Sequence, residues 1–422
     1  MVILLAENVL TITASVVVFL LVTMTLVVLL LYARKKLMPG GTVKVSINNG
    51  EKILEVEKGS SLLTTLSDNQ VFLPSACGGG GTCAQCRCQV PKGGGGILPT
   101  EVDFFTRKEA HDYWRLGCQV KVKNDMEIVV PEAVLGVKKW ECEVVSNKNV
   151  ATYIKEFIVK LPEGEHLNFS SGGYIQIDIP EYQLNYSEFD IDEKFRAEWT
   201  QYKMWDLDCK NIEPTVRAYS MANYPAEGDI VMLNVRIATP PFDPATKGFK
   251  KVSPGIASSY IFNLKPGDKV MVSGPYGEFH PILDSKREML YVGGGAGMAP
   301  LRSHILHLLN TLKITDRKIT YWYGGRSKGE IFYEEDFRAL EKKFPNFTFN
   351  IALSAPLPED KWTGYTGFIH DVIYKNYLIN HDEPEEIEYY MCGPGPMAKA
   401  VEKMLDSLGV PPEMLMFDDF GF

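Results

Sequence analysis

A continuous apolar stretch is the first feature in the pattern of hydrophobic and polar positions. From Val9 to Leu31 no charged residue occurs. At ~1.5 Å per residue a helix of this length extends roughly 35 Å, enough to cross a ~30 Å hydrocarbon core. Glu7 precedes the stretch and Arg34-Lys35-Lys36 follows it, which predicts a retained membrane anchor over 1–36 with the downstream domains in the cytoplasm. The alternative is a cleaved signal peptide, which would have basic residues before a shorter apolar core.

Alternating apolar and polar residues after Gly41 predict a small domain of short strands. The expected elements are strands at 42–48, 52–56, 118–122 and 126–130 and helices at 60–66 and after Thr100. The first two strands flank Asn49-Gly50, a strong hairpin signal. In this order the elements resemble the β-grasp fold of ferredoxins over residues 42–133.

Two further regions of the chain have different patterns of apolar and polar residues. Residues 137–280 contain many short Val, Ile and Tyr strands separated by turns, which predicts a small antiparallel barrel. Residues 286–422 alternate apolar strands with amphipathic helices, which predicts an α/β domain with a parallel sheet. The chain is therefore expected to be multi-domain, with an anchor, a ferredoxin-type domain, a barrel and a Rossmann-like domain.

Composition narrows the class of protein. The chain has 422 residues, a net charge of −9 and eight cysteines. The length predicts two to four domains. The negative charge, with no dense Lys/Arg tract after residue 36, argues against a nucleic-acid partner. Eight cysteines in a chain of this size do not make a disulfide framework, so the bulk belongs in a reducing compartment.

Four cysteines have the spacing of a metal centre. The candidate ligands are Cys77, Cys83, Cys86 and Cys118, the first three in a glycine-rich loop. Three close cysteines and a distant fourth are typical of a [2Fe–2S] cluster, although the first gap is one residue longer than in plant ferredoxins. A zinc site is the alternative, but zinc sites usually use two close pairs. Cys88 is interpreted as a strand cysteine, and Cys142 and Cys209 as ordinary packing or surface residues.

The barrel carries motifs of a flavin site. Arg217-Ala218-Tyr219-Ser220 is followed by Gly255-Ile-Ala-Ser258-Ser259 and Gly274-Pro275-Tyr276-Gly277. In this order they resemble the flavin domain of the ferredoxin–NADP reductase superfamily. The resemblance implies that Arg217 neutralises an FAD phosphate, that Tyr219 lies against the isoalloxazine ring and that Ser220 bonds near N5. It further implies that Gly255, Ser258 and Ser259 open a helix whose amides hold the pyrophosphate.

An acidic and aromatic segment at 181–213 is not explained by the reductase pattern. Its composition predicts a solvated lobe with a small core of its own. A docking surface for a partner is the alternative interpretation.

The last domain carries two motifs at strand ends. Gly293-Gly-Gly295-Ala-Gly297-Met-Ala-Pro300 follows an apolar strand at 289–292 and opens a helix, and Cys392-Gly393-Pro-Gly-Pro-Met397 follows a strand at 388–391. Both resemble elements of the same superfamily, which implies nicotinamide binding with Cys392 beside the nicotinamide. Arg326 follows the strand at 319–323, near where the adenosine ribose would lie. Some relatives bind the 2′-phosphate of NADP where Arg326 and Lys328 stand, so these residues alone do not decide between NADH and NADPH as the donor.

The last residues of the chain contain three phenylalanines that could lie over a flavin. They read Phe417-Asp-Asp-Phe420-Gly-Phe422. Reductases of this superfamily often place a C-terminal aromatic residue over the flavin, where the nicotinamide must displace it. That resemblance implies this role for Phe420, with Phe417 and Phe422 as competitors.

Over its whole length the chain resembles the F subunits of bacterial Na+-translocating NADH:quinone oxidoreductases. The resemblance implies FAD, one [2Fe–2S] cluster, NADH as donor, partner subunits of a Na+-pumping complex in the bacterial inner membrane, and quinone as the final acceptor. Because the anchor has no charged residue, it offers no ion path, so sodium transport is expected in the partners. The alternatives are the reductase component of a multicomponent oxygenase, which needs no anchor, and a tethered electron carrier without NADH chemistry. The identity of the quinone is left open.

Overall fold

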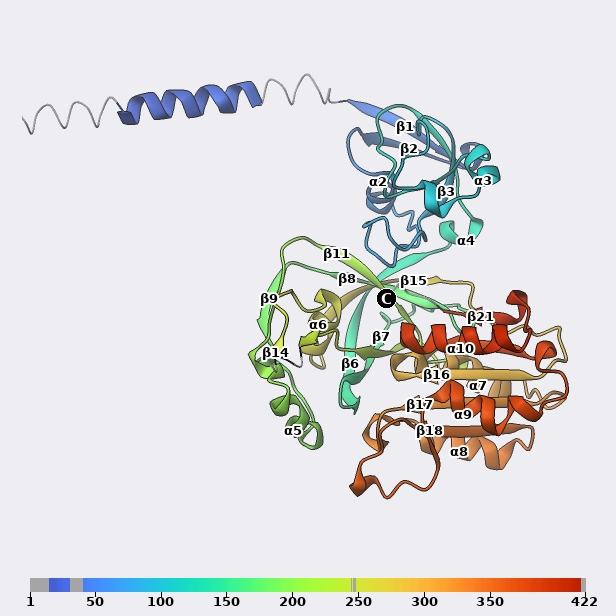
Figure 1. Cartoon of the computed structure of the whole chain (residues 1–422). Helices are drawn as coiled ribbons and strands as arrows, with labels where there is room; N and C mark the ends of the chain where they lie inside the picture. The colour runs from blue at the N-terminus through green and yellow to red at the C-terminus, as the bar shows by residue number, and fades with distance from the viewer. Residues whose placement is uncertain (1–14, 31–40, 244, 246–247, 419–422) are drawn as a thin grey trace, which may run out of the picture. The chain divides into compact units, whose positions relative to one another are not determined.

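The computed structural model describes residues 15–30, 41–243, 245 and 248–418. The chain divides into two compact units: Met1–Leu73 with Ala84–Leu135, and Pro74–Cys83 with Gly136–Phe422. Figure 1 labels many of the helices and strands of each unit.

Residues 15–30 of the predicted anchor form a helix with exposed side chains. Within this helix the hydroxyls of Thr23 and Thr25 donate to main-chain carbonyls one turn back, each at 2.8 Å. The rest of the predicted span, residues 9–14 and Leu31, lies outside the described residues. In the part of the chain that the structure describes, no helix is long and apolar enough to cross a membrane.

The first unit contains a mixed five-stranded sheet in the order β2-β1-β5-β3-β4. Its elements are β1 (Thr42–Ile47), β2 (Lys52–Glu57), α2 (Leu62–Asp68), β3 (Arg87–Lys92), α3 (Arg107–His111), β4 (Trp114–Leu116), β5 (Met126–Val129) and α4 (Glu132–Leu135). The predicted hairpin is confirmed: β1 and β2 pair antiparallel, and Asn49 turns the chain with φ 59°. Alternate residues of β1 are buried in one core with Leu62 and Leu66 of α2, because a strand presents every second side chain to one face.

Two predictions in this unit are wrong. Residues 118–122 form no strand and make only an isolated bridge, between Ser61 and Lys121. Thr100 does not start the second helix. Thr106 does so, through a capping box in which its hydroxyl accepts from the Glu109 amide and the Glu109 carboxylate accepts from the Thr106 amide. A capping signal needs a helix-forming run directly after it, and that run begins only at Arg107.

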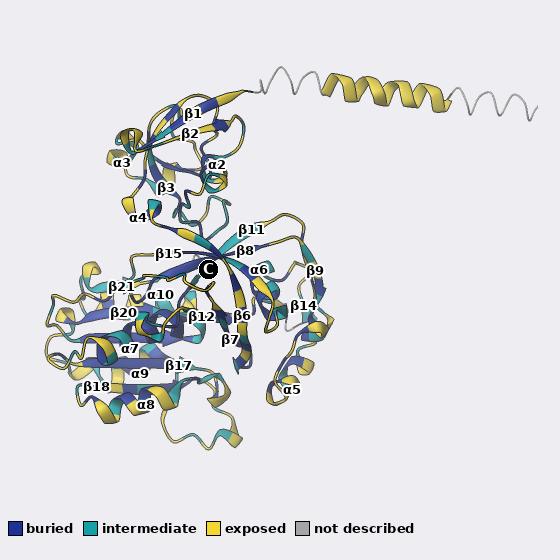
Figure 2. Cartoon of the chain, turned by 180° about the vertical axis from the view of Figure 1, so that it is seen from behind, coloured by how far each residue is buried: buried dark blue, intermediate teal, exposed yellow. Residues whose placement is uncertain are grey.

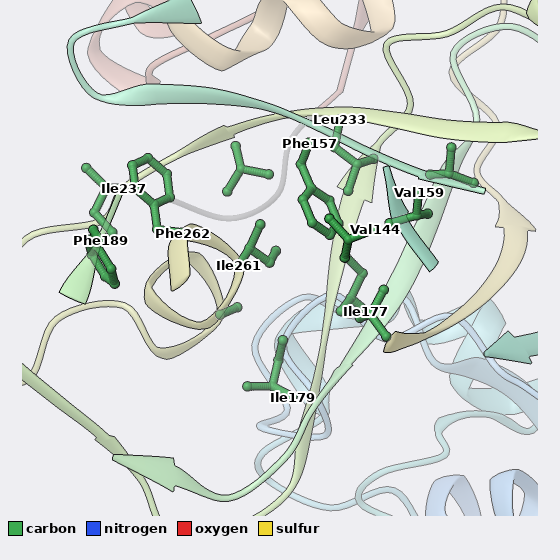
Figure 3. Close-up of a cluster of buried hydrophobic side chains, with 14 of the residues drawn as sticks. Val144, Phe157, Val159, Ile177, Ile179, Phe189, Leu233, Ile237, Ile261 and Phe262 are labelled. Carbon is green, nitrogen blue, oxygen red and sulfur yellow. The ribbon is translucent and has the colours of Figure 1, made fainter. Parts of the chain in front are cut away.

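The predicted barrel forms the first part of the second unit. Six antiparallel strands follow the order β11-β8-β15-β6-β7-β12, and a bridge between Met221 and Leu233 joins the segments at its two edges. The strands are β6 (Lys138–Ala151), β7 (Ile154–Lys160), β8 (Tyr174–Ile179), β11 (Thr215–Ser220), β12 (Ile230–Arg236) and β15 (Lys269–Tyr276), with β13 (Phe242–Asp243) and β14 (Gly248–Phe249) outside the sheet. Helix α6 (Ile256–Asn263) packs against the barrel through Ile261 and Phe262, which belong to the same core as Phe157 and Leu233. In Figure 3 the Phe262 ring lies beside Ile237 and Phe189.

The segment at 181–213 has no separate core, contrary to the sequence-based expectation. It contains β9 (Tyr182–Asn185), α5 (Glu193–Gln201) and β10 (Asp208–Asn211). Its apolar side chains join the barrel core, and Trp199 is buried there with Nε1 donating to the carbonyl of Thr152 at 2.8 Å. Trp199 packs against Tyr186, Phe189 and Trp205 of its own segment and also against Tyr153 and Phe262 from outside it, so the segment and the barrel share one core.

The rest of the second unit is the predicted parallel α/β fold. Its six strands follow the order β19-β18-β17-β16-β20-β21. They are β16 (Met289–Gly294), β17 (Ile319–Gly325), β18 (Phe347–Leu353), β19 (Tyr365–Thr366), β20 (Glu388–Cys392) and β21 (Leu415–Phe417), and the helices are α7 (Met298–Leu306), α8 (Glu334–Lys343), α9 (Ile369–Asn376) and α10 (Gly395–Ser407). One core joins α7 and α8 to the sheet and another joins α9 and α10 (Figure 1). The central strands are buried between helices whose outer sides are exposed (Figure 2), so the carboxyl ends of the strands carry the accessible chemistry.

Candidate functional site

In the glycine-rich cysteine loop, hydrogen-bond donors surround the sulfur of Cys77. Cys77 and Cys83, both in the second unit, bring their Sγ atoms to 3.3 Å from each other. The hydrogen bond from the Cys83 thiol lowers the pKa of Cys77 to about 3, together with the backbone amides of Cys83, Thr82 and Gly79, against the opposing effect of burial. A thiolate surrounded by amides is the form of cysteine that iron binds.

Cys86 and Cys118 lie in the first unit, at the ends of a strand pair. Arg87 of β3 pairs with Leu116 of β4, and the Gly117 amide donates to the Cys86 carbonyl at 2.8 Å. Gln119 Nε2 lies 3.7 Å from Cys118 Sγ. The four predicted ligands are thus divided between the two units. Among the described residues, no group of three or more His, Cys, Asp or Glu side chains is placed to hold a metal ion.

Cys88, Cys142 and Cys209 lie in hydrophobic cores, as the sequence predicts for packing residues. Burial raises the pKa of Cys88 to about 12, outweighing the opposing effect of Arg115. Burial likewise raises the pKa of Cys142 to about 12. These two side chains are therefore neutral thiols, as expected of cysteines packed in a core.

Strand β11 carries the predicted flavin residues at one edge of the sheet. Tyr219 is half-buried and pairs with Ile175, while Ser220 at the strand end is buried. The Ser220 hydroxyl donates to Asp418 Oδ2 at 2.6 Å. Asp418 was not a sequence candidate. It follows β21, and its amide lies 3.3 Å from the Met391 carbonyl, next to Cys392.

Arg217 lies against the cysteine loop. Its Nη1 donates to the carbonyl of Cys77 at 3.1 Å, to Thr215 Oγ1 and to the Val216 carbonyl. Gly78 makes this approach possible: it has φ +66°, and a Cβ there would lie 2.4 Å from Arg217 Nη1. The arginine expected at a flavin phosphate thus also fixes the backbone of a predicted cluster ligand.

The start of α6 is held by the two predicted serines. Ser258 Oγ accepts from the Ala238 amide at 3.0 Å, and Ser259 Oγ donates to the Gly255 carbonyl at 2.8 Å. Tyr186 Oη lies 2.8 Å from Ser259 Oγ. Because both hydroxyls are engaged in this turn, the backbone amides of the first helical turn are the groups offered to an anion.

The two glycine motifs of the α/β part lie against each other. A Cβ on Gly297 would come within 2.0 Å of the Cys392 carbonyl oxygen, and one on Gly393 within 2.5 Å of Met397 Cε. Gly295 has φ +56°, which favours glycine, and its carbonyl accepts from Tyr323 Oη at 3.1 Å. The strand ends of β16 and β20 therefore form one continuous backbone surface.

The surrounding residues complete this surface. A Cβ on Gly293 would lie 2.7 Å from Tyr321 Oη, and Pro300 is buried in the first turn of α7. Arg236 Nη1 would lie 3.8 Å from a Cβ at Gly295 and brings a positive charge to the turn. A glycine turn with an adjacent cation fits a dinucleotide phosphate. Arg236 was missed because it ends a barrel strand, far along the chain from the motif.

At the end of β17, Arg326 makes an ion pair with Glu198 of α5 at 2.6 Å. Tyr153 Oη donates to the same carboxylate oxygen at 3.0 Å. Phe420, the predicted flavin cover, lies outside the described residues, and Phe417 ends β21 with its side chain exposed.

Three known domain families match parts of this chain. Residues 45–123 match the 2Fe-2S iron-sulfur cluster binding domain, residues 188–280 the oxidoreductase FAD-binding domain, and residues 291–403 the oxidoreductase NAD-binding domain. These matches fit a [2Fe–2S] cluster, FAD and NADH as the cofactors and substrate of the chain.

Similar curated proteins extend over nearly the whole chain. One from Neisseria meningitidis is 53% identical over 407 residues, 96% of this chain and 98% of the relative. One from Methylococcus capsulatus is 55% identical over 403 residues, 96% of this chain and 97% of the relative. Each is named as the F subunit of a Na(+)-translocating NADH-quinone reductase.

Solved structures share the fold. A cytochrome P450 reductase from Amycolatopsis is 22% identical, with a TM-score of 0.60, and the match covers 90% of this chain and 99% of that one. The ferredoxin reductase of a carbazole 1,9a-dioxygenase is also 22% identical, with a TM-score of 0.58 and the same coverage.

Proposed function

Because this chain belongs to the family of F subunits of Na(+)-translocating NADH-quinone reductases, we propose that it is the electron-input component of such a complex. It passes electrons from NADH through FAD and a [2Fe–2S] cluster to partner subunits and on to quinone. The observation that carries this proposal is the identity of more than half of the residues along nearly the full length, with all three cofactor domains matched.

The residues around β11 would hold FAD. The amides at the start of α6, set by Gly255, Ser258 and Ser259, would bind its pyrophosphate. Arg217 and Tyr219 would hold the phosphate and the ring, and Ser220 would lie at the reactive edge. Bound FAD supplies the conversion between two-electron hydride chemistry and single-electron transfer.

The strand ends of β16 and β20 would hold NADH. Gly293, Gly295 and Gly297 let the backbone approach the pyrophosphate, and Cys392, with Gly393 and Met397 behind it, would lie beside the nicotinamide. The Ser220–Asp418 hydrogen bond joins the barrel to the end of β21, next to Cys392. This contact would orient the serine hydroxyl toward the reacting edge, and Phe420 would cover the flavin in the absence of NADH.

Cys77, Cys83, Cys86 and Cys118 would bind the cluster. The amides around Cys77 favour the thiolate that iron requires. Anchoring by 9–31 in the bacterial inner membrane, with the soluble parts in the cytoplasm, is the proposed arrangement with the partner subunits. The apolar sequence of this segment and the basic residues after it support it. The oxygenase-reductase alternative is not favoured, because the relatives identical at half of their residues carry the quinone-reductase name.

A chain that begins at Gly41 tests whether NADH oxidation is independent of the N-terminal apolar segment, whereas quinone reduction in the membrane requires it. It should fold, because the described first unit builds its core after residue 41, and it should bind FAD and reduce ferricyanide with NADH. It should not restore quinone reduction to membranes that lack the native chain, since nothing would hold the cluster at its acceptor. The measurement is NADH:quinone activity after the protein is added back.

The full-length chain, added at the same concentration, is the control and should restore activity. Full recovery with the truncated chain at low concentration would show that the apolar segment is dispensable and that contacts of the soluble parts suffice for assembly.

A further inference from the structure

The end of β17 lies where a dinucleotide fold distinguishes NADH from NADPH. In such folds the strand after the glycine turn ends beside the adenosine ribose, where an acid accepts from the 2′-hydroxyl or an arginine binds the 2′-phosphate. Here β16 and β17 pair in parallel with Gly294 opposite Gly324, and Arg326 follows shortly after. The strand end itself reads Gly324-Gly325-Arg326-Ser327 and contains no acid. By local sequence alone this site favours the phosphorylated nucleotide.

The missing carboxylate comes from the segment at 181–213. Glu198 of α5 pairs with the Arg326 guanidinium at 2.6 Å, although 128 positions separate them in the sequence. The Arg326 side chain is 52% exposed and that of Glu198 is 25% exposed, so the arginine faces solvent with its carboxylate partner already in place. Tyr202, just after α5, is a further hydrogen-bond partner of the guanidinium.

Glu198 is held rigidly before any nucleotide arrives. The next residue, Trp199, is buried, and its indole donates to the Thr152 carbonyl at 2.8 Å. The hydroxyl of Tyr153 donates to the Glu198 carboxylate at 3.0 Å. The barrel therefore holds this end of α5 through the buried Trp199, and the Tyr153 hydroxyl holds the carboxylate itself.

We propose that Glu198 is a specificity-determining residue that makes this site select NADH over NADPH by occupying Arg326. The proposal rests on the proposed function and extends it to the choice of donor. A 2′-phosphate carries close to two negative charges and would meet a carboxylate fixed on the arginine that should bind it. Juxtaposed like charges weaken the binding of a ligand and are a common source of specificity. The unphosphorylated ribose of NADH brings no charge and meets no such repulsion.

This arrangement also gives the segment at 181–213 a role within the chain. Four of its aromatic residues, Tyr186, Phe189, Phe195 and Trp199, are buried in the barrel core, while Glu198 contacts the nucleotide-binding part. The same helix thus connects the flavin barrel to the ribose end of the donor site. Lys328, the other predicted cation at this strand end, has its backbone amide bound by Asp360 at 3.0 Å, which holds the loop that carries Arg326.

The test is steady-state kinetics of NADH and NADPH oxidation with ferricyanide, on the full chain carrying Glu198→Gln. The ratio of kcat/KM for NADPH to that for NADH should rise at least about tenfold, through a lower KM for NADPH. Arg326→Ala leaves the carboxylate unopposed and should lower the ratio below that of the wild type. In the double variant the gain should disappear, because the released arginine is its source.

Glu193→Gln is the matched control, since Glu193 lies on the same helix with its side chain 92% exposed and pairs with Arg196. It should change neither the ratio nor the NADH activity. Binding of 2′,5′-ADP compared with 5′-ADP gives a readout independent of turnover, and only the former should bind more tightly to Glu198→Gln.

An unchanged ratio in Glu198→Gln, or a gain that persists without Arg326, would overturn the proposal while leaving the proposed function intact. If the wild-type chain oxidised neither nucleotide, the proposed function itself would fail. If Glu198→Gln does not fold, Arg326→Ala still decides, because an unchanged or higher ratio in that variant contradicts occupation of the arginine by Glu198.

Discussion

Replacing Cys77 by serine is expected to lower NADH:quinone activity at least about 100-fold while NADH–ferricyanide activity and FAD content are retained. Serine cannot supply the thiolate that iron requires, so the cluster is lost. Electrons then still enter at FAD, where ferricyanide can take them, but their route to the partner subunits is broken. The same result is expected for Cys83, Cys86 and Cys118.

Cys88→Ala is the control, because Cys88 lies near the proposed ligands in the sequence but is a buried, protonated thiol. It should retain iron, FAD and both activities. The measurements are iron and acid-labile sulfide per FAD, with both activities assayed on the same preparation. Loss of the cluster in the Cys88 variant and its retention in the Cys77 variant would refute the ligand assignment.

The second large effect is expected at the hydrogen bond between Ser220 and Asp418. A bond to a charged acceptor contributes about 1.5–3 kcal/mol, which corresponds to roughly a 10- to 100-fold change in rate. Ser220→Ala should slow NADH-dependent flavin bleaching by this factor at saturating NADH, with FAD still bound. Asp418→Asn removes the charge but keeps an acceptor, so its effect should be smaller. Stopped-flow absorbance measures both.

The double variant tests whether the two side chains act as one unit. If the hydroxyl is oriented by the carboxylate, Ser220→Ala with Asp418→Asn should be no slower than Ser220→Ala alone. If the fold-decrease in the bleaching rate of the double variant equalled the product of the two single fold-decreases, the residues would act independently. Unchanged bleaching rates in both single variants would show that this contact is not part of the hydride-transfer site.

The fold could be predicted from the sequence where short-range signals determine it. The hairpin at Asn49-Gly50 and the strand–glycine–helix pattern after Met289 each lie within one short window, and both are confirmed. Segments that depend on distant partners were predicted less well. Residues 118–122 look like a strand, but their backbone hydrogen bonds are divided between Leu116 and the residues around the start of α2, so no ladder forms.

The candidate site shows the same limit. The glycine motifs were found because close backbone approach requires glycine and leaves a local signature. Asp418 and Glu198 were missed because each contacts its partner across 198 and 128 positions, respectively. Nothing beside Glu198 marks it as functional, and the motif around Asp418 drew attention to its phenylalanines rather than to the acid. The aromatic residues around Glu198 suggested a lobe with its own core, since the pattern shows that they are apolar but not which surface they cover.

An anaerobic titration of the purified full chain with NADH, followed by EPR and by flavin absorbance, tests the electron route most directly. The account predicts that the rhombic signal of a reduced [2Fe–2S] centre appears as the flavin absorbance is bleached. A flavin fully bleached by excess NADH, with no cluster signal in a preparation that contains iron and sulfide, would contradict it.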